Sequence, residues 1–299
     1  MKSLAAIPAG TLREALPALL SAWITDPEAA QASQQRVQRL LDEATDEQMS
    51  ELAAHLEFLG EEDRFFAAQP LARRFAREWC VPLLVEWEVL GLEHLHSARA
   101  LGPTLLLCNH LSYLDTTATD ALLLWSGAED VANHIVAIAG PKVYADPFRR
   151  FAAASLNTLP APQSTRLDGT ASIGPRELAR KALESVRLAH EALDSGFIPL
   201  LYPEGSRTRT GQMRPFLKAV ARYLRYTDLR VVPMSIVGTD RVFPVDADRL
   251  QPAPVRIAFG EPLLVIPEDE RGLLERVHGK IAELLPEAYR PLPDEPAIQ

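Results

Sequence analysis

A histidine and an aspartate five residues apart are the first side chains in this sequence that could do chemistry together. Asn109-His110 and Asp115 directly follow the apolar run 104–108. A histidine can take a proton from a hydroxyl when a carboxylate holds its other ring nitrogen and stabilises the imidazolium that forms. The spacing indicates a catalytic pair that activates a nucleophile supplied by the substrate. A turn histidine followed by an aspartate helix cap has the same spacing, so a purely structural role stays open.

A second polar turn, residues 203–209, follows the apolar run 197–201. Gly205 lets the backbone approach a ligand closely, and Arg207 and Arg209 carry guanidinium groups that suit phosphate oxygens. A solvated basic turn would have the same composition. Taken alone, this segment leaves phosphate binding and simple solvation open.

Together and in this order, the two segments resemble the glycerolipid acyltransferase family, which includes glycerol-3-phosphate and 1-acylglycerol-3-phosphate acyltransferases. The family's Asn-His-x-x-x-x-Asp motif matches Asn109, His110 and Asp115, and its Pro-Glu-Gly-Thr/Ser-Arg run matches residues 203–207. The resemblance covers about residues 85 to 260.

Two further blocks match the family more loosely. Residues 140–148 stand where the family has its acceptor-side block, and residues 231–235 resemble a buried strand that lines the acyl side. Some relatives place a basic acceptor-binding element where this chain has the loop 163–175 with Arg166. The identity of the acceptor depends on whether such basic side chains face the site.

The resemblance implies a role for each matched residue. His110 would deprotonate the acceptor hydroxyl, Asp115 would orient its imidazole, and the alkoxide would attack the thioester carbonyl without forming an acyl-enzyme. The residues expected to bind the acceptor phosphate are Arg207, Arg209, Lys142 and Arg149. Those expected to support the loop are Glu204, Gly205 and Ser206, the last two also offering N–H donors to an oxyanion. No metal and no cofactor is expected, only an acyl thioester as co-substrate.

The expected function is therefore transfer of a fatty acyl group to a hydroxyl of glycerol-3-phosphate or of a lysophospholipid such as lysophosphatidate, in phospholipid biosynthesis. Acyl-CoA or acyl-carrier protein would be the donor. Two other functions stay open. One is a diverged, non-enzymatic module that binds lipid or carrier protein, and the other is a thioesterase that uses His110 to activate water.

Composition restricts the partners and the compartment. The chain has 299 residues with a net charge of −9, which argues against nucleic acid as the main partner. Cys80 and Cys108 are too few and too far apart for a disulfide framework or a zinc site. No apolar run approaches the ~20 residues of a membrane-spanning helix. We expect a cytoplasmic protein with peripheral contact to the inner face of a membrane as an option.

The hydrophobic pattern predicts an α/β fold with a mixed, mostly parallel sheet flanked by helices. An N-terminal helical domain is expected over residues 1–80, an α/β domain over 81–290, and a loose tail over 291–299. The expected strands after the β-rich segment 81–90 are 104–108, 135–139, 197–201, 230–237 and 255–259. The expected helices of the α/β domain are 116–125, 175–194, 215–225 and 268–285.

Capping signals and aromatic spacing refine the N-terminal region. Asp26-Pro27 predicts a helix start, and Thr45 with Gln48 matches a capping box. The helix expected over 62–79 carries aromatic and arginine residues, so it could lie on an anionic membrane or dock on the α/β core, and docking is favoured. Two histidines, His190 and His278, are expected on exposed helix faces.

Overall fold

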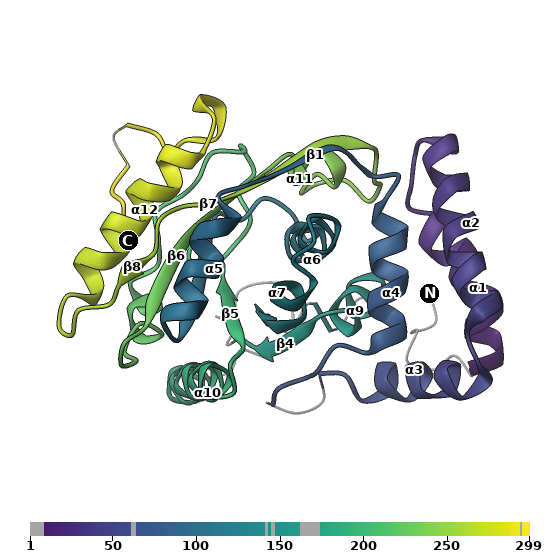
Figure 1. Ribbon diagram of the computed structural model, residues 1–299, viewed down its shortest axis with the longest axis horizontal. Helices are drawn as coiled ribbons and strands as arrows, with labels where there is room; N and C mark the ends of the chain where they lie inside the picture. Colours follow the sequence, from purple (N-terminus) through teal and green to yellow (C-terminus); the bar gives the residue numbers. More distant parts are fainter. Residues whose placement is uncertain (1–8, 61–63, 141–142, 145–146, 162–173, 294) are drawn as a thin grey trace.

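The computed structural model describes residues 9–60, 64–140, 143–144, 147–161, 174–293 and 295–299. A mixed sheet of eight strands is flanked by helices, so the expected α/β class is confirmed (Figure 1). The strands are β1 (Leu84–Leu90), β2 (Thr104–Cys108), β3 (Ile135–Ala139), β4 (Asn157–Pro160), β5 (Ile198–Leu201), β6 (Arg230–Val237), β7 (Ala253–Phe259) and β8 (Leu263–Leu264).

The helices cover the sheet and extend the molecule at its N-terminal end. They are α1 (Ala9–Ser21), α2 (Pro27–Glu43), α3 (Asp46–Phe58), α4 (Pro70–Cys80), α5 (Leu92–Leu101), α6 (Asp115–Trp125), α7 (Glu129–His134), α9 (Pro147–Ala154), α10 (Pro175–Asp194), α11 (Thr239–Val242) and α12 (Glu270–Leu284). The 3-10 turns η2 (Lys218–Arg222) and η3 (Glu287–Tyr289) accompany them. In Figure 1, α1 to α3 lie beyond α4 at one end of the molecule, and α12 lies at the other.

The strand order brings three strand ends together. The order is β1-β7-β6-β2-β5-β3-β4, with β8 also paired to β6. Strand β2 lies between β5 and β6 and is parallel to both, so these three strands end at the same edge of the sheet. Antiparallel pairing is confined to β6 with β7 and β6 with β8 among the described strands. Ligands of open α/β sheets bind at such carboxyl ends.

The strands β2, β3 and β6 begin and end where the hydrophobic pattern predicts, because buried parallel strands are continuous apolar runs. Strand β4 and helix α5 were not expected. The segment 215–225 was expected to be a helix, but only the short turn η2 forms there. Leu217 N–H donates to the Pro203 carbonyl at 2.8 Å and so holds this segment extended beside the polar turn.

The N-terminal region forms four helices with the caps that the sequence predicts. Asp26 accepts a hydrogen bond from Ala29 N–H, and Thr45 forms the reciprocal capping box with Gln48. Helix α4 begins at Pro70 instead of near residue 62, because Gln69 caps the helix and Pro70 occupies its first turn.

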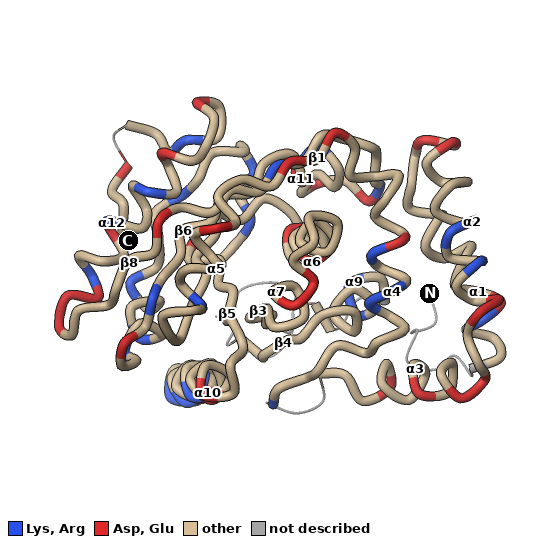
Figure 2. Tube along the Cα trace, viewed as in Figure 1, with Lys and Arg blue, Asp and Glu red and all other residues tan. Residues whose placement is uncertain are grey.

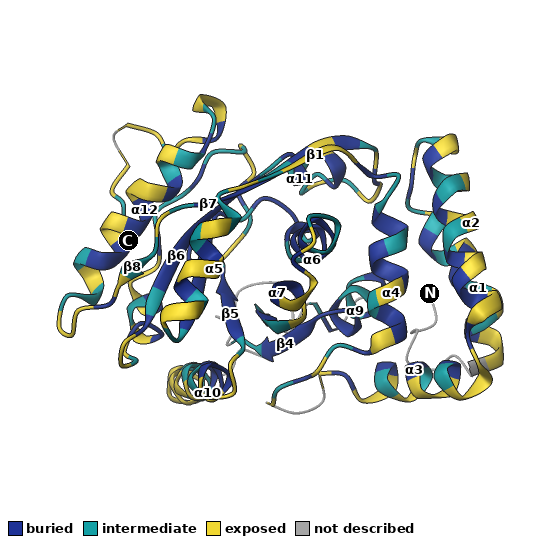
Figure 3. Ribbon diagram, viewed as in Figure 1, coloured by how far each residue is buried: buried dark blue, intermediate teal, exposed yellow. Residues whose placement is uncertain are grey.

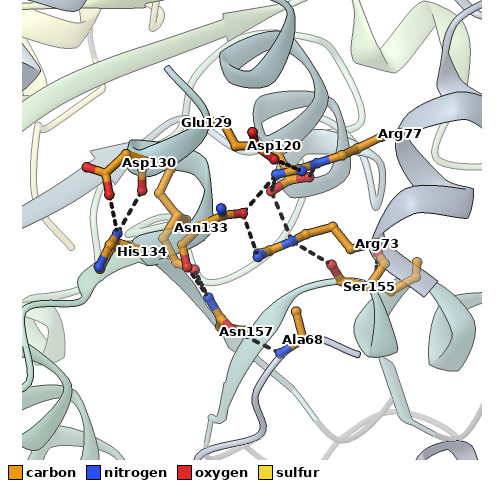
Figure 4. A network of polar contacts seen from close by, with 12 residues as sticks. Ala68, Arg73, Arg77, Asp120, Glu129, Asp130, Asn133, His134, Ser155 and Asn157 are labelled. Atoms are coloured by element: carbon orange, nitrogen blue, oxygen red, sulfur yellow. Dashed lines mark hydrogen bonds and ion pairs between the residues drawn. The ribbon is translucent and has the colours of Figure 1, made fainter. Parts of the chain in front are cut away.

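Helix α4 docks on the α/β layer through its aromatic face. Phe75 is fully buried and Trp79 is 4% exposed, which confirms docking over exposure on this face. Arg77 is buried as well, and its guanidinium binds Asp120 of α6 (Figure 4). Asn133 of α7 accepts hydrogen bonds from both Arg73 and Arg77. Arg73 and Arg77 of α4 therefore contribute to a buried polar network, whereas Arg74 pairs with Glu43 at the surface.

A continuous cluster of buried residues extends from the N-terminal helices into the sheet. Figure 3 shows buried residues along the strands and on α4 and α6. The last residues are not a loose tail: Phe216 N–H donates to the Ala297 carbonyl, Gln299 N–H donates to the Phe216 carbonyl, and Ile298 is 7% exposed. His278 is also buried, edge-on to the Phe216 ring, which corrects the exposed position expected for it. Over the described ranges, no helix is both long and apolar enough to cross a bilayer.

Candidate active site

Three loops meet where β2, β5 and β6 end. The His110 loop follows β2, the turn 203–209 follows β5, and Gly238-Thr239 follows β6. The side chain of Asn109 joins the first loop to the third, because it donates to the Ile236 carbonyl at 2.9 Å and accepts from Ile236 N–H at 2.8 Å. Thr208 N–H donates to the His110 carbonyl at 2.9 Å and joins the first loop to the second.

His110 and Asp115 are in contact. The distance from His110 Nδ1 to Asp115 Oδ2 is 2.8 Å. With Asp115 ionised, Nδ1 is the donor, so Nε2 keeps a lone pair that can accept a proton. The His110 ring stacks on Tyr202, with centroids 4.1 Å apart, and its side chain is 17% exposed. The imidazole is therefore held on two sides and open to a substrate on the remaining one.

Asp115 is the first residue of α6 and its carboxylate is almost fully buried. Besides His110, the carboxylate accepts from the backbone N–H groups of Leu111 at 2.8 Å and Ser112 at 3.1 Å. The Thr239 hydroxyl donates to Oδ1 at 2.5 Å. Four donors, counting His110, therefore hold the carboxylate in place at the start of α6.

Glu204 connects the two motif segments through their backbones. Its Oε1 accepts from His110 N–H at 2.8 Å, and its Oε2 accepts from Arg214 N–H at 2.9 Å. Burial raises the pKa of Glu204 to about 8, although both N–H groups and the Arg214 charge act to lower it. Both carboxylate oxygens are thus engaged by loop backbone and not directed at an acceptor.

Gly205 has a left-handed backbone, with φ of 72°. A Cβ at this position would lie 2.3 Å from Leu217 Cδ1, so the turn requires glycine. Its N–H donates to the Tyr202 carbonyl at 3.0 Å, which closes the turn and corrects the expectation that it serves an oxyanion. The Ser206 hydroxyl accepts from Arg214 Nη1 at 2.6 Å.

Arg207 and Arg149 gather at the ring of Tyr113. The guanidinium carbon of Arg207 lies 3.6 Å from the ring centroid, and that of Arg149 lies 4.6 Å from it. Burial lowers the pKa of Arg207, Arg149 lowers it further, and Tyr113 and Asp115 oppose this effect. Two of the four expected phosphate-binding residues therefore share the Tyr113 ring, and Arg207 also interacts electrostatically with Asp115.

The other expected phosphate-binding residues are placed differently. Arg209 is 75% exposed and lies 3.5 Å from Asp246, so its recorded ion pair is with another surface residue. Lys142 and the loop residue Arg166 lie outside the described part of the chain. Arg209 is the one expected residue that the structure separates from the others it describes.

Tyr113, Tyr202 and Thr239 are parts of the site that were not predicted from the sequence. Tyr113 and Tyr202 lie inside the two motif segments, so their position was a signal that could have been used. Thr239 follows Gly238 at the end of a buried strand, and nothing local in the sequence connects it to Asp115, which lies 124 positions away.

Cys80 and Cys108 are buried free thiols whose pKa values burial raises.

Comparison with known proteins agrees with this geometry. A family model described as Acyltransferase matches residues 87–237, just over half of the chain and including both motif segments. A 1-acyl-sn-glycerol-3-phosphate acyltransferase of Cocos nucifera is 29% identical over 115 residues, 37% of each chain. A chloroplastic 1-acyl-sn-glycerol-3-phosphate acyltransferase of Brassica napus is 23% identical over 197 residues, 66% of this chain and 50% of that protein.

Among solved structures, the 1-acyl-sn-glycerophosphate acyltransferase PlsC of Thermotoga maritima is 18% identical with a TM-score of 0.47, over 92% of each chain. The chain spans half or less of the length of the two curated relatives named above. The family model covers His110, Asp115, Glu204 and Arg207 in one continuous match. The resemblance to glycerolipid acyltransferases is thereby confirmed, and this chain belongs to the Acyltransferase family.

Proposed function

We propose that this protein is an O-acyltransferase that moves a fatty acyl group from a thioester to a hydroxyl of a phosphate-bearing glycerol acceptor. One observation carries the proposal: the loop that holds the His110–Asp115 contact also carries Tyr113, whose ring binds the arginine pair, and the charge of Asp115 acts on Arg207. A base and an anion site in one place suit an acceptor that has a hydroxyl and a phosphate group. The two curated relatives described above are named for 1-acyl-sn-glycerol-3-phosphate, so lysophosphatidate is the first acceptor to test.

In the proposed reaction one proton is transferred twice, first from the acceptor hydroxyl to His110 and then from His110 to the thiolate. His110 Nε2 takes the proton of the acceptor hydroxyl, and the oxygen attacks the thioester carbonyl to form a tetrahedral intermediate. The intermediate collapses by breaking the carbon–sulfur bond, and the imidazolium returns the proton to the departing thiolate. Asp115 stabilises the imidazolium between the two steps. The products are an ester and a free thiol, and His110 is regenerated.

The donor and the location belong to the same proposal. Acyl-CoA and acyl-carrier protein both present the thioester that the mechanism requires, and each is to be tested. A lysophospholipid acceptor resides in a membrane, so we propose a cytoplasmic enzyme that contacts the inner face of a membrane peripherally. No cofactor takes part in the proposed steps.

The test is acceptor-dependent release of thiol from a long-chain acyl thioester. The full chain is assayed with lysophosphatidate, with glycerol-3-phosphate and without an acceptor, using acyl-CoA and acyl-carrier protein as donors. In His110→Ala, kcat should fall by at least about 10²- to 10⁴-fold, because the general base is lost, while circular dichroism and melting temperature show an intact fold.

The other outcomes would identify the rival functions. Release of thiol without any acceptor would indicate a thioesterase. A folded wild-type protein that binds lipid or carrier protein but releases no thiol with either donor would indicate a binding module. Equal rates in wild type and His110→Ala would reject the proposed mechanism.

Arg207 and Arg209 provide a matched pair for the phosphate site. Arg207→Ala should raise the KM for the acceptor by about ten- to a hundredfold, the range of one charge-assisted contact, with little change in the KM for the donor. Arg209→Ala removes a solvent-exposed guanidinium two residues away and should change neither by more than about threefold. Equal effects of the two substitutions would contradict a phosphate site at Tyr113.

A further inference from the structure

Thr239 is a buried polar residue that the family match does not include. The match ends at residue 237, two positions earlier, and the Thr239 side chain is fully buried. Its hydroxyl donates to Asp115 Oδ1 at 2.5 Å. A donor on a carboxylate that itself holds the reacting histidine is in a position to affect catalysis without touching substrate.

The backbone around Thr239 is shaped for this contact. Gly238 has φ of 95°, and a Cβ there would lie 2.0 Å from the Pro254 carbonyl oxygen, so the sharp turn after β6 requires glycine. The turn directs Thr239 back toward α6 at the first residue of α11.

Two further hydrogen bonds fix the same segment to the histidine loop. Asn109 exchanges both of its amide hydrogen bonds with Ile236, three residues before Thr239. The Ser112 hydroxyl donates to the Phe243 carbonyl at 2.8 Å, four residues after it. The loop that carries His110 and Asp115 is therefore attached to the segment 236–243 before, at and after the Thr239 contact.

The two oxygens of the Asp115 carboxylate accept hydrogen bonds from different donors. Oδ2 accepts from His110 and from Leu111 N–H, both at 2.8 Å, whereas Oδ1 accepts from Thr239 at 2.5 Å. The Ser112 N–H is shared between both oxygens at 3.1 Å. Without the Thr239 hydroxyl, Oδ1 would keep only the shared 3.1 Å contact from Ser112 N–H, and the carboxylate plane would be less restrained against rotation that moves Oδ2 from Nδ1. We propose that Thr239 is a positioning residue that fixes the Asp115 carboxylate, and through it the tautomer and direction of His110, for proton transfer.

Thr119 offers an internal control. It is also a buried threonine whose hydroxyl donates to Asp115, but it binds the backbone carbonyl at 2.8 Å and not the carboxylate. Thr119→Val and Thr239→Val make the same isosteric change, each burying a methyl in place of a hydroxyl. Of these two variants, Thr239→Val removes a hydrogen-bond donor from the Asp115 carboxylate, and Thr119→Val does not.

The kinetic test rests on the proposed function, so wild type and His110→Ala are assayed first. Thr239→Val should lower kcat by about ten- to a hundredfold, the range for one hydrogen bond to a charged group, with the KM for donor and acceptor changed less than about threefold. Thr239→Ser keeps the hydroxyl and should retain kcat within about threefold. Thr119→Val should do the same.

Thr239→Ala covers the case in which the valine variant does not fold, because it differs from Thr239→Ser by the hydroxyl alone. Equal kcat in Thr239→Ser and Thr239→Ala, or an equal loss in Thr119→Val, would overturn the inference while leaving the acyltransferase proposal intact. If wild type shows no acceptor-dependent activity, the proposed function fails separately.

A spectroscopic measurement tests the positioning role without activity. The hydrogen-bonded proton on His110 Nδ1 should give a downfield proton resonance, identified by its disappearance in His110→Ala. We expect the signal to persist in Thr119→Val and Thr239→Ser and to be lost or broadened in Thr239→Val and Thr239→Ala. Its persistence in all four variants would show that Thr239 does not position the pair.

Discussion

Burial and backbone hydrogen-bond donors have opposite effects on the pKa of the Glu204 carboxyl group. Burial favours the neutral acid and raises the pKa to about 8, whereas the N–H groups of His110 and Arg214 favour the carboxylate. Burial is the larger effect. The Glu204 carboxyl group, which joins the two loops, therefore changes its protonation near pH 8.

The raised pKa of Glu204 has a defined consequence for stability. Between about pH 5 and pH 8 the folded protein holds a proton here that the unfolded chain releases, so rising pH weakens the fold through this group. Glu204→Gln cannot titrate. Its melting temperature minus that of wild type should therefore become more favourable to the variant as pH rises from about 5 to 8. A constant difference would show that the two N–H groups keep Glu204 ionised throughout.

Helix α6 carries Asp115 at its first residue, and α4 fixes the same helix one turn and a half later. Arg77 Nε and Nη2 bind the two carboxylate oxygens of Asp120 at 2.7 and 3.2 Å, and all of these groups are buried (Figure 4). Arg73 lies 3.4 Å from the same carboxylate. The N-terminal helices are thus attached to the helix that presents the candidate catalytic aspartate.

Breaking this buried ion pair should cost far more stability than breaking a surface pair on the same helix. Arg77→Leu should lower the free energy of unfolding by about 3–5 kcal/mol, because it leaves Asp120 without its main partner in a buried position. Arg74→Leu breaks the exposed pair with Glu43 and should cost about 0–1 kcal/mol. Denaturant unfolding of both variants measures the difference, and equal losses would contradict a structural role for the buried pair.

The whole molecule is joined by one continuous set of buried side chains that extends from Leu12 of α1 to the sheet and to Ile298 near the C-terminal end. The division into a helical and an α/β domain stays a prediction. Surface charge is mixed: acidic and basic side chains pair along α10 and α12. Figure 2 shows residues of both signs on these two helices. With a net charge of −9, anion binding depends on a local site such as the arginine pair at Tyr113.

The local sequence determined several of the strands and helices and identified the residues of the two motif segments. The strand 104–108 and the helix 175–194 were predicted to the residue, since each is set by apolar periodicity and by proline or glycine at its ends. The family resemblance rested on two short segments, and the structure brings His110 into contact with Asp115 as that resemblance implied. The 3-10 turn at 218–222 escaped prediction because contacts with other segments override helical propensity there.

Tertiary structure alone decided what surrounds those residues. Thr239 reaches Asp115 and Arg77 reaches Asp120 because β6 lies beside β2 and because α4 packs on α6, neither of which is a local property of the chain. The two arginines converge on Tyr113 for the same reason, while the exposed Arg209 does not. A sequence pattern records the spacing of residues along one segment, whereas hydrogen-bond partners and burial depend on which segments the fold places side by side.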